Sequence, residues 1–151
     1  MPTYQVYTSH HCLTVPVKAS VARAITRAHS EVTGADNFFA QVMFTEKAAE
    51  DYYLGGRPLQ ANHLFVHGVI RARSLELKKV LIEKLVSEIA NAASLHQRYI
   101  WVYLSDLPPD MMVEFGHVLP QPGEEAAWAN MLTVEDREYM HSTDYLGQDN
   151  P

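Results

Sequence analysis

A proline occupies position 2 of this chain, directly after the initiator methionine. Methionine is normally removed when the next residue is small, and its removal leaves Pro2 with a free secondary amine. An ordinary α-amino group titrates near pH ~8, and burial or a neighbouring charge moves this pKa in either direction. A free Pro2 held by a strand could therefore act as a general acid or a general base near neutrality. Alone, the feature is weak evidence, because many chains begin Met-Pro without catalytic meaning.

Two arginines, Arg71 and Arg73, follow directly after an apolar segment. Residues two apart project to the same side of a chain that stays extended. Arginine binds carboxylates through two parallel hydrogen bonds, so such a pair could hold an acidic substrate. The alternative is a solvated pair at the end of a strand.

Glu114 and Tyr103 are two further side chains that could be part of a site. Glu114 lies in the apolar sequence Met111–Phe115, and burial among apolar groups raises the pKa of a carboxyl and suits it to proton transfer. The alternative is a loop glutamate that faces solvent. Tyr103 lies near the end of another apolar segment, where it could equally serve packing in the core or at an interface.

The histidines are less specific. His29 lies four residues after Ile25, on the apolar side of a predicted helix, where a hydrogen-bonded structural histidine is the commoner outcome. His10, His11 and Cys12 are adjacent but have no partner cluster at a known zinc spacing. We therefore expect no metal.

Hydrophobic periodicity predicts two similar units that must position these residues. The first unit comprises a strand at 3–9, a helix from Pro16 to about Val32 stopped by Gly34, and a strand at Phe38–Phe44. The second comprises a strand at His63–Ile70, a helix over Leu77–Ala93 with Ser74 as its N-cap, and a strand at Tyr99–Leu104. A short helix is also expected around Glu124 to Met131.

This pattern predicts an α/β (α+β) fold made of two fused β-α-β units. Each unit makes its two strands parallel, so together they give a four-stranded mixed sheet with both helices on one face. The other face then needs a cover, and oligomerisation supplies one. We expect a single domain over 1–151, with halves at about 2–60 and 61–120 and a tail at 121–151.

Composition excludes several classes of protein. The 151 residues carry a net charge of −6 and no basic block, so nucleic acid is not an expected partner. No apolar run approaches the ~18–20 residues of a membrane helix, and no signal-peptide pattern precedes the first strand. Cys12 is the single cysteine, so an internal disulfide cannot form. We expect a cytoplasmic protein with no membrane partner.

In several blocks along residues 2–140, the chain resembles the tautomerase superfamily and, within it, the cis-3-chloroacrylic acid dehalogenase group. The blocks that carry the resemblance are Ala24–His29, Ala40–Val42, Phe65–Gly68, Ile100–Tyr103, Met112–Glu114 and Leu119–Gly123. The resemblance implies the tautomerase fold, a homotrimer, no cofactor and a small carboxylate as substrate.

The resemblance also implies roles for six residues: a catalytic amine, three groups that hold the substrate carboxylate and polarise its double bond, and two that position and deprotonate the attacking water. In that order they are Pro2; His29, Arg71 and Arg73; and Tyr103 and Glu114. Two positions depart from the group's pattern. Arg71 and Arg73 are two apart where the group has a spacing of three, and Phe115 stands where the group has tyrosine.

Two mechanisms use this set of residues. Hydrolytic dehalogenation of a cis-3-haloacrylate to malonate semialdehyde requires a cationic Pro2, which the charge of Glu114 favours. Enol–keto tautomerisation of the phenylpyruvate type requires a neutral Pro2, which the two arginines favour. Dehalogenation is our leading hypothesis, and tautomerisation with only low or promiscuous dehalogenase activity is the alternative. A non-catalytic trimeric carboxylate-binding protein is the second alternative.

Overall fold

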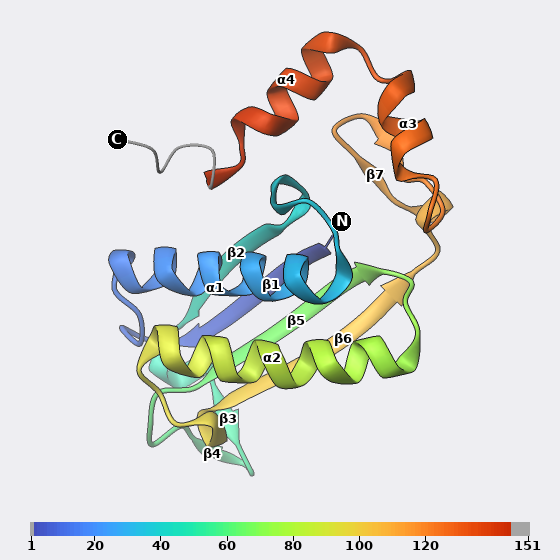
Figure 1. The fold of residues 1–151 in the computed structure, drawn as a ribbon. Coiled ribbons are helices and arrows are strands. Elements are labelled where there is room, and N and C mark those ends of the chain that lie inside the picture. The colour runs from blue at the N-terminus through green and yellow to red at the C-terminus, as the bar shows by residue number, and fades with distance from the viewer. Residues whose placement is uncertain (1, 146–151) are drawn as a thin grey trace.

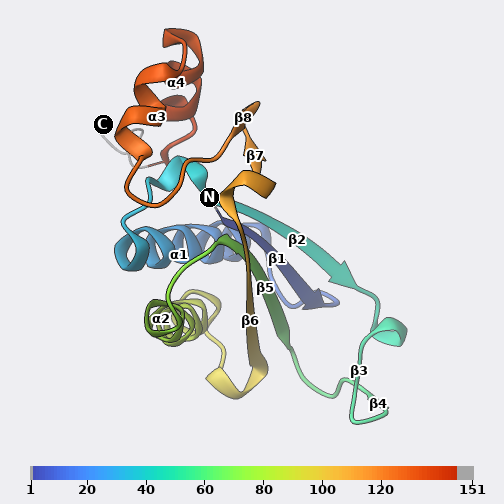
Figure 2. The same cartoon turned by 90° about the vertical axis from the view of Figure 1, so that its right-hand side faces the viewer.

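Two long helices cover one face of a four-stranded sheet, and the opposite face carries no helix (Figures 1 and 2). The computed structural model describes residues 2–145. The sheet has the order β2-β1-β5-β6, made of β1 (Pro2–Ser9), β2 (Gln41–Lys47), β5 (Leu64–Arg71) and β6 (Ile100–Leu107). The helices are α1 (Val15–Thr33) and α2 (Leu75–Ala93). The strands β1 and β2 are parallel, as are β5 and β6, while β1 and β5 are antiparallel. The predicted mixed sheet and the placement of both helices on one face are therefore confirmed.

Local sequence explains how these elements begin and end. Along β1, buried side chains such as Tyr4 and Val6 alternate with more exposed ones, as expected for a strand with one covered face. The helix α1 ends where Gly34 adopts a left-handed conformation with φ 73°, which glycine reaches without a Cβ penalty. At the start of α2, the Ser74 side chain accepts a hydrogen bond from the Leu77 amide at 3.2 Å. The predicted helix stop and N-cap are confirmed.

The prediction of a strand starting at Phe38 was wrong. Asn37–Phe39 forms a short 3-10 turn, and β2 begins only at Gln41. Phe39 is buried against residues of the C-terminal region, including Trp128, which lies 5.9 Å away between ring centroids. Phe38 and Phe39 are of a residue type that is common in strands, but here burial against a distant helix determines the conformation of this segment.

The face of the sheet without helices exposes large apolar side chains. Exposed positions on this open face include Met43 of β2, at 40%, and Trp101 and Tyr103 of β6, at 44% and 55%. Phe65 lies between them on β5 and stacks on Tyr7, with ring centroids 5.8 Å apart. Several large apolar side chains exposed on one face of a sheet are typical of a contact between protein chains.

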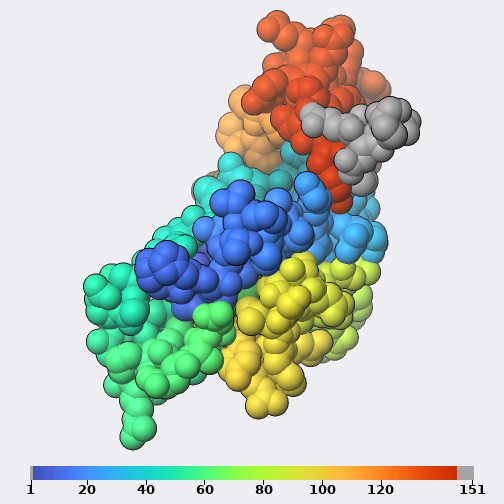
Figure 3. Space-filling view, turned by 90° about the vertical axis from the view of Figure 1, so that its left-hand side faces the viewer, coloured from blue at the N-terminus to red at the C-terminus, as the bar shows by residue number. Residues whose placement is uncertain are grey.

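Beyond the sheet, the chain adds short elements and a second apolar cluster. The remaining strands form two hairpins: β3 (Tyr53–Leu54) with β4 (Arg57–Pro58), and β7 (Val113–Glu114) with β8 (His117–Val118). The remaining helices are α3 (Glu125–Met131), α4 (Val134–Ser142) and four 3-10 turns at Asn37–Phe39, Ala49–Asp51, Gln97–Tyr99 and Pro109–Met111. The buried residues of the second cluster are Phe39, Leu119, Trp128, Leu132 and Met140. Figure 3 shows α3 and α4 standing above the layer formed by α1 and α2.

The short helix expected around Glu124–Met131 is confirmed as α3. The helix α4 was not predicted, because its polar sequence shows no clear apolar stripe. Its N-cap was a usable signal: the Thr133 side chain accepts a hydrogen bond from the Asp136 amide at 3.1 Å. None of the helices within residues 2–145 is long and apolar enough to span a membrane.

Candidate active site

The start of β1 and the end of β5 lie side by side. Antiparallel pairing sets Pro2 opposite Ile70, so the first described residue of the chain is adjacent to Arg71 on the neighbouring strand. Pro2 is itself buried. The sheet therefore places the N-terminal proline and the arginine segment, which are distant in sequence, at the same end of its two central strands.

Arg71 is almost completely buried, with 3% of its side chain exposed. Its Nη1 donates a hydrogen bond to the Pro120 carbonyl at 2.9 Å, and its Nη2 donates one to Glu125 Oε1 at 2.5 Å. Partial burial favours protonation of Glu125, but its hydrogen bonds from Arg71 and from backbone amides lower the pKa of this carboxyl overall. Arg71 and Glu125 therefore form an ionised pair near neutral pH, and nothing in the sequence indicated it.

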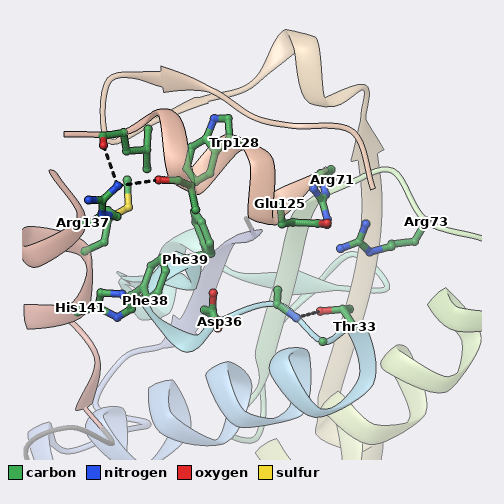
Figure 4. Close-up of a pocket in the computed structure, with 15 residues that line it drawn as sticks. Thr33, Asp36, Phe38, Phe39, Arg71, Arg73, Glu125, Trp128, Arg137 and His141 are labelled. Carbon is green, nitrogen blue, oxygen red and sulfur yellow. Dashed lines mark hydrogen bonds and ion pairs between the residues drawn. The ribbon is translucent and has the colours of Figure 1, made fainter. Parts of the chain in front are cut away.

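Arg73 lies just beyond the strand. Because β5 ends at Arg71, the strand alternation used to predict a common orientation does not reach Arg73. Both arginines nevertheless line one cavity (Figure 4). Burial and the nearby Arg71 lower the pKa of Arg73, which still leaves an arginine charged near neutrality. Among residues 2–145, no carboxylate lies within ion-pair distance of the Arg73 guanidinium.

The cavity that holds both arginines has a volume of about 410 Å³. Its walls come from the segment after α1 and from α3 and α4, with Phe38, Phe39 and Trp128 between the two ends (Figure 4). Pockets of this size and apolar lining are typical of small-molecule sites. We call it the arginine cavity.

His29 is buried behind this region, with 4% of the residue exposed, and is not among the residues that line the arginine cavity. Its Nδ1 lies 2.8 Å from the Tyr4 hydroxyl. Burial, with the nearby charges of Arg73 and Arg71, lowers the pKa of His29 to about 3, and burial raises the pKa of Tyr4. Both shifts indicate that the neutral phenol donates to a neutral imidazole, which leaves Nε2 as the nitrogen that carries the proton. His29 is thus buried and hydrogen-bonded, which is the commoner outcome for a histidine at such a position, and its contact with a substrate stays a prediction.

Glu114 lies on the hairpin β7-β8 and lines a second, more open cavity of about 820 Å³. Burial raises the pKa of its carboxyl, while positive charge at the amino terminus and on Arg71 partly opposes this. The raised pKa expected from its apolar neighbours is thereby confirmed. Phe38 and Phe39 line both cavities, so this pair forms the wall that Glu114 and the arginines share.

Tyr103 lies apart from the other predicted site residues. It projects from β6 on the open face, where its ring packs edge-on against Phe65 at 5.1 Å between centroids. It lines a separate hollow next to the hairpin β3-β4. The structure therefore does not bring Tyr103 and Glu114 together within one chain.

One surface cluster could hold a metal ion. The ligand atoms of His10, His11 and Glu46 all lie within 4.8 Å of one another. However, Glu46 Oε2 also lies 3.7 Å from the Lys18 ammonium, and an adjacent cation disfavours a second positive charge. None of these residues lines the arginine cavity.

Sequence reasoning missed two partners of the predicted residues. Tyr4 was assigned to a strand, but its hydrogen bond to His29 depends on the packing of α1 on β1. Glu125 was visible only as an acidic residue at the start of a predicted helix, a position that the helix dipole already favours. No sequence signal connected it to Arg71.

Two β-α-β units with a buried proline at the start of β1 and arginines at the end of β5 define a tautomerase-type protein. The chain belongs to the family described as putative oxalocrotonate tautomerase enzyme, whose model matches residues 1–132. Among curated proteins, none is similar enough in sequence to match it.

Solved structures show the same fold. N1, a member of the cis-3-chloroacrylic acid dehalogenase family, is 29% identical and superposes with a TM-score of 0.87 over 93% of this chain and 99% of its own. Q0 fused 4-OT, a wild-type symmetric trimer, is 24% identical, with a TM-score of 0.64 over 71% of this chain and 86% of its own. FG41 malonate semialdehyde decarboxylase, inhibited by 3-bromopropiolate, is 12% identical, with a TM-score of 0.64 over 87% and 98%. The last two show the fold alone.

Proposed function

We propose that the protein is a cofactor-independent enzyme that uses the amine of Pro2 on small unsaturated carboxylates. The leading reaction is hydrolytic dehalogenation of a cis-3-haloacrylate. The observation that carries this proposal is the pairing of Pro2 with Ile70, which puts the N-terminal proline next to the strand end that leads into Arg71 and Arg73. Both arginines line the arginine cavity. The similarity to N1 of the dehalogenase family supports the choice of substrate class.

In this mechanism the arginines bind the substrate carboxylate, and Glu114 takes a proton from water as the water attacks C3. The cationic amine of Pro2 gives its proton to C2, and the resulting halohydrin loses hydrogen halide to form malonate semialdehyde. Burial raises the pKa of Glu114, which makes its carboxylate a stronger base. Turnover should therefore rise as Glu114 ionises and fall as the amine loses its proton. The neutral His29, whose Nδ1 is bonded to Tyr4, can help to orient the substrate with at most one hydrogen bond, donated by Nε2.

Assembly into a homotrimer completes the site in this proposal. Tyr103 and Phe65 lie on the open face, so a second chain placed there would receive the Tyr103 hydroxyl. The trimeric state of Q0 fused 4-OT supports the expected symmetry. Tyr103 would then help to position the water at the site of a neighbouring copy.

Tautomerisation is the second candidate. Two guanidiniums beside an amine favour its neutral form, which can act as a base on an enol. The aromatic walls of the arginine cavity, Phe38, Phe39 and Trp128, also suit a phenylpyruvate-type substrate. A trimer that only binds carboxylates would keep the same cavity without using the amine.

A substrate panel and one substitution distinguish these functions. The wild-type protein is assayed with cis- and trans-3-haloacrylate for halide release and with phenylenolpyruvate for ketonisation, and its N-terminus is determined by mass spectrometry. Pro2→Ala replaces the rigid secondary amine with a more mobile primary amine and should reduce turnover by at least ~10-fold, because the reacting nitrogen is no longer held in place. Pro16→Ala, at the start of α1, is the matched control and should keep activity.

Halide release from the cis isomer alone supports dehalogenation, whereas rapid ketonisation with negligible halide supports the tautomerase. An intact Met1 would make Pro2 an amide and contradict both reactions. Full activity of Pro2→Ala would contradict a requirement for the secondary amine of proline, and ligand binding without any turnover would favour the binding protein.

A further inference from the structure

Of the two arginines in the cavity, Arg71 already forms an ion pair with a carboxylate of the same chain, that of Glu125. Glu125, at the start of α3, accepts a hydrogen bond from Arg71 Nη2 through Oε1, and its Oε2 accepts one from the Gly123 amide at 2.8 Å. The side chain keeps 44% of its surface exposed and lines the arginine cavity. A negative charge is therefore fixed at the place where a second carboxylate of a ligand would bind.

The neighbouring arginine has no such partner. Arg73 lines the same cavity, and no carboxylate of the described residues pairs with its guanidinium, although Glu125 acts on it at longer range. Guanidinium groups that lack a carboxylate are the natural binding groups for an incoming one. In this cavity the charge of Arg71 is therefore balanced by Glu125, whereas the charge of Arg73 has no carboxylate paired with it among the described residues.

The other charged groups that line the cavity lie away from this end. Arg137 and His141 are at the opposite end, beyond Phe38 and Trp128, and Asp36 lies between the two ends (Figure 4). Arg137 donates hydrogen bonds to the carbonyls of Ala129 at 3.2 Å and Leu132 at 2.9 Å, which close α3. Apart from Arg71, which is paired with Glu125, a short ligand anchored on Arg73 would meet Glu125 and aromatic surface before it reached another cation.

From this juxtaposition we propose that Glu125 is a specificity-determining residue, which restricts the arginine cavity to acids with a single carboxylate near Arg73 and an apolar remainder. The proposal rests on the proposed function, whose substrate class it narrows. A cis-dicarboxylate would bring its second carboxylate against Glu125, and two like charges at close range disfavour binding. A monocarboxylate with the same skeleton would present a methyl group or halogen there instead.

The test compares the binding of two anions that differ in one group. Isocrotonate and maleate share a four-carbon cis skeleton, and a methyl group in the first replaces a carboxylate in the second. Dissociation constants for both are measured by isothermal titration calorimetry on the wild-type protein and on Glu125→Gln. Gln keeps the shape and can still accept the hydrogen bond from Arg71. It loses the charge and the hydrogen bond from the Gly123 amide, because an amide nitrogen cannot accept one. Glu124→Gln is the matched control, since it removes the same charge one residue earlier at an exposed position.

We expect the wild-type protein to bind isocrotonate at least as tightly as maleate. Glu125→Gln should shift the ratio of the two constants toward maleate by about 10-fold, and Glu124→Gln should leave it within about twofold. Arg73→Gln should weaken isocrotonate binding by at least ~10-fold, more than Arg71→Gln does. Because each ratio is taken within one variant, a loss of folded protein affects both constants equally.

An unchanged ratio in Glu125→Gln, a clear wild-type preference for maleate, or no binding of either anion would each overturn the inference. Neither anion contains a halogen, so the measurement is independent of the halide assay. If the ratio shifts as expected but Pro2→Ala keeps full turnover, only the proposed function fails. If turnover depends on Pro2 but the ratio does not shift, only the role of Glu125 fails.

Discussion

The two faces of the sheet differ in how far a single chain buries them. On the helix-covered face, Tyr4 is fully buried and its hydroxyl is bonded to His29. On the open face, Trp101 and Tyr103 remain 44% and 55% exposed. The predicted site residues differ in the same way: Arg71 and His29 are buried within one chain, whereas Tyr103 is exposed on the open face. One chain therefore completes the contacts of its helix-covered face and leaves the side chains of the open face exposed, as the proposed assembly requires.

The largest expected effect is on assembly. Phe65→Asp places a charge in the middle of the open face, where Phe65 packs against Tyr7 and Tyr103. A buried unpaired carboxylate is costly, so the variant should be monomeric at concentrations where the wild type is trimeric. Light scattering after size-exclusion chromatography measures this. Val80→Asp, on the exposed surface of α2, is the control and should keep the wild-type mass. An assembled Phe65→Asp would show that the open face is not the interface.

The next effect concerns packing under the helices. A Cβ at Gly68 would lie 2.5 Å from Tyr4 Cε1 and 2.7 Å from Leu104 Cδ2, so Gly68→Ala must displace buried side chains. We expect a loss of about 1–3 kcal/mol in the free energy of unfolding, measured by urea titration. Thr45→Ala, at an exposed position on the open face, should change it by less than ~0.5 kcal/mol. Equal stabilities would mean that the covered face is as tolerant as the open one.

A pH dependence should come from His29. Its pKa in the folded protein is about 3, against about 6.5 in an unfolded chain, so the unfolded state binds a proton that the folded state does not. Stability is fully present above pH ~6.5 and is lost as the pH falls toward the folded value. Between pH 7.5 and 5, the wild type should lose roughly 2 kcal/mol more than His29→Gln, measured by urea unfolding at each pH. Parallel pH profiles would contradict a buried neutral histidine.

The smallest effect separates two tyrosines of the same strand. Tyr4→Phe removes the hydroxyl bonded to buried His29 and should cost about 1 kcal/mol in the free energy of unfolding. Tyr7→Phe, on the open face, removes only a 3.4 Å hydrogen bond to Gln5 and should cost less than ~0.5 kcal/mol. Urea unfolding of both variants at pH 7.5 gives the comparison. A larger loss for Tyr7→Phe would reverse the assignment of the two faces.

Short-range sequence patterns were sufficient to predict the main helices and strands. The spacing of apolar residues predicted α1, and Gly34 and Ser74 marked helix ends that the structure contains. The same reasoning placed a strand at Phe38, because composition cannot reveal that Phe39 packs against Trp128. A local pattern therefore predicts an element correctly when the periodicity of that element determines which side chains are buried. It fails when a distant helix determines their burial.

Periodicity and motif order, which are properties of neighbouring residues, were enough to predict the two β-α-β units, the half-covered sheet and the family of the chain. The arrangement of the candidate site follows instead from the packing of distant segments. This packing joined Arg71 to Glu125 across 54 residues and Tyr4 to His29 across 25, and it separated Tyr103 from Glu114. Such contacts depend on how α1 and α3 pack, and the energy of packing is shared among residues that no local pattern connects.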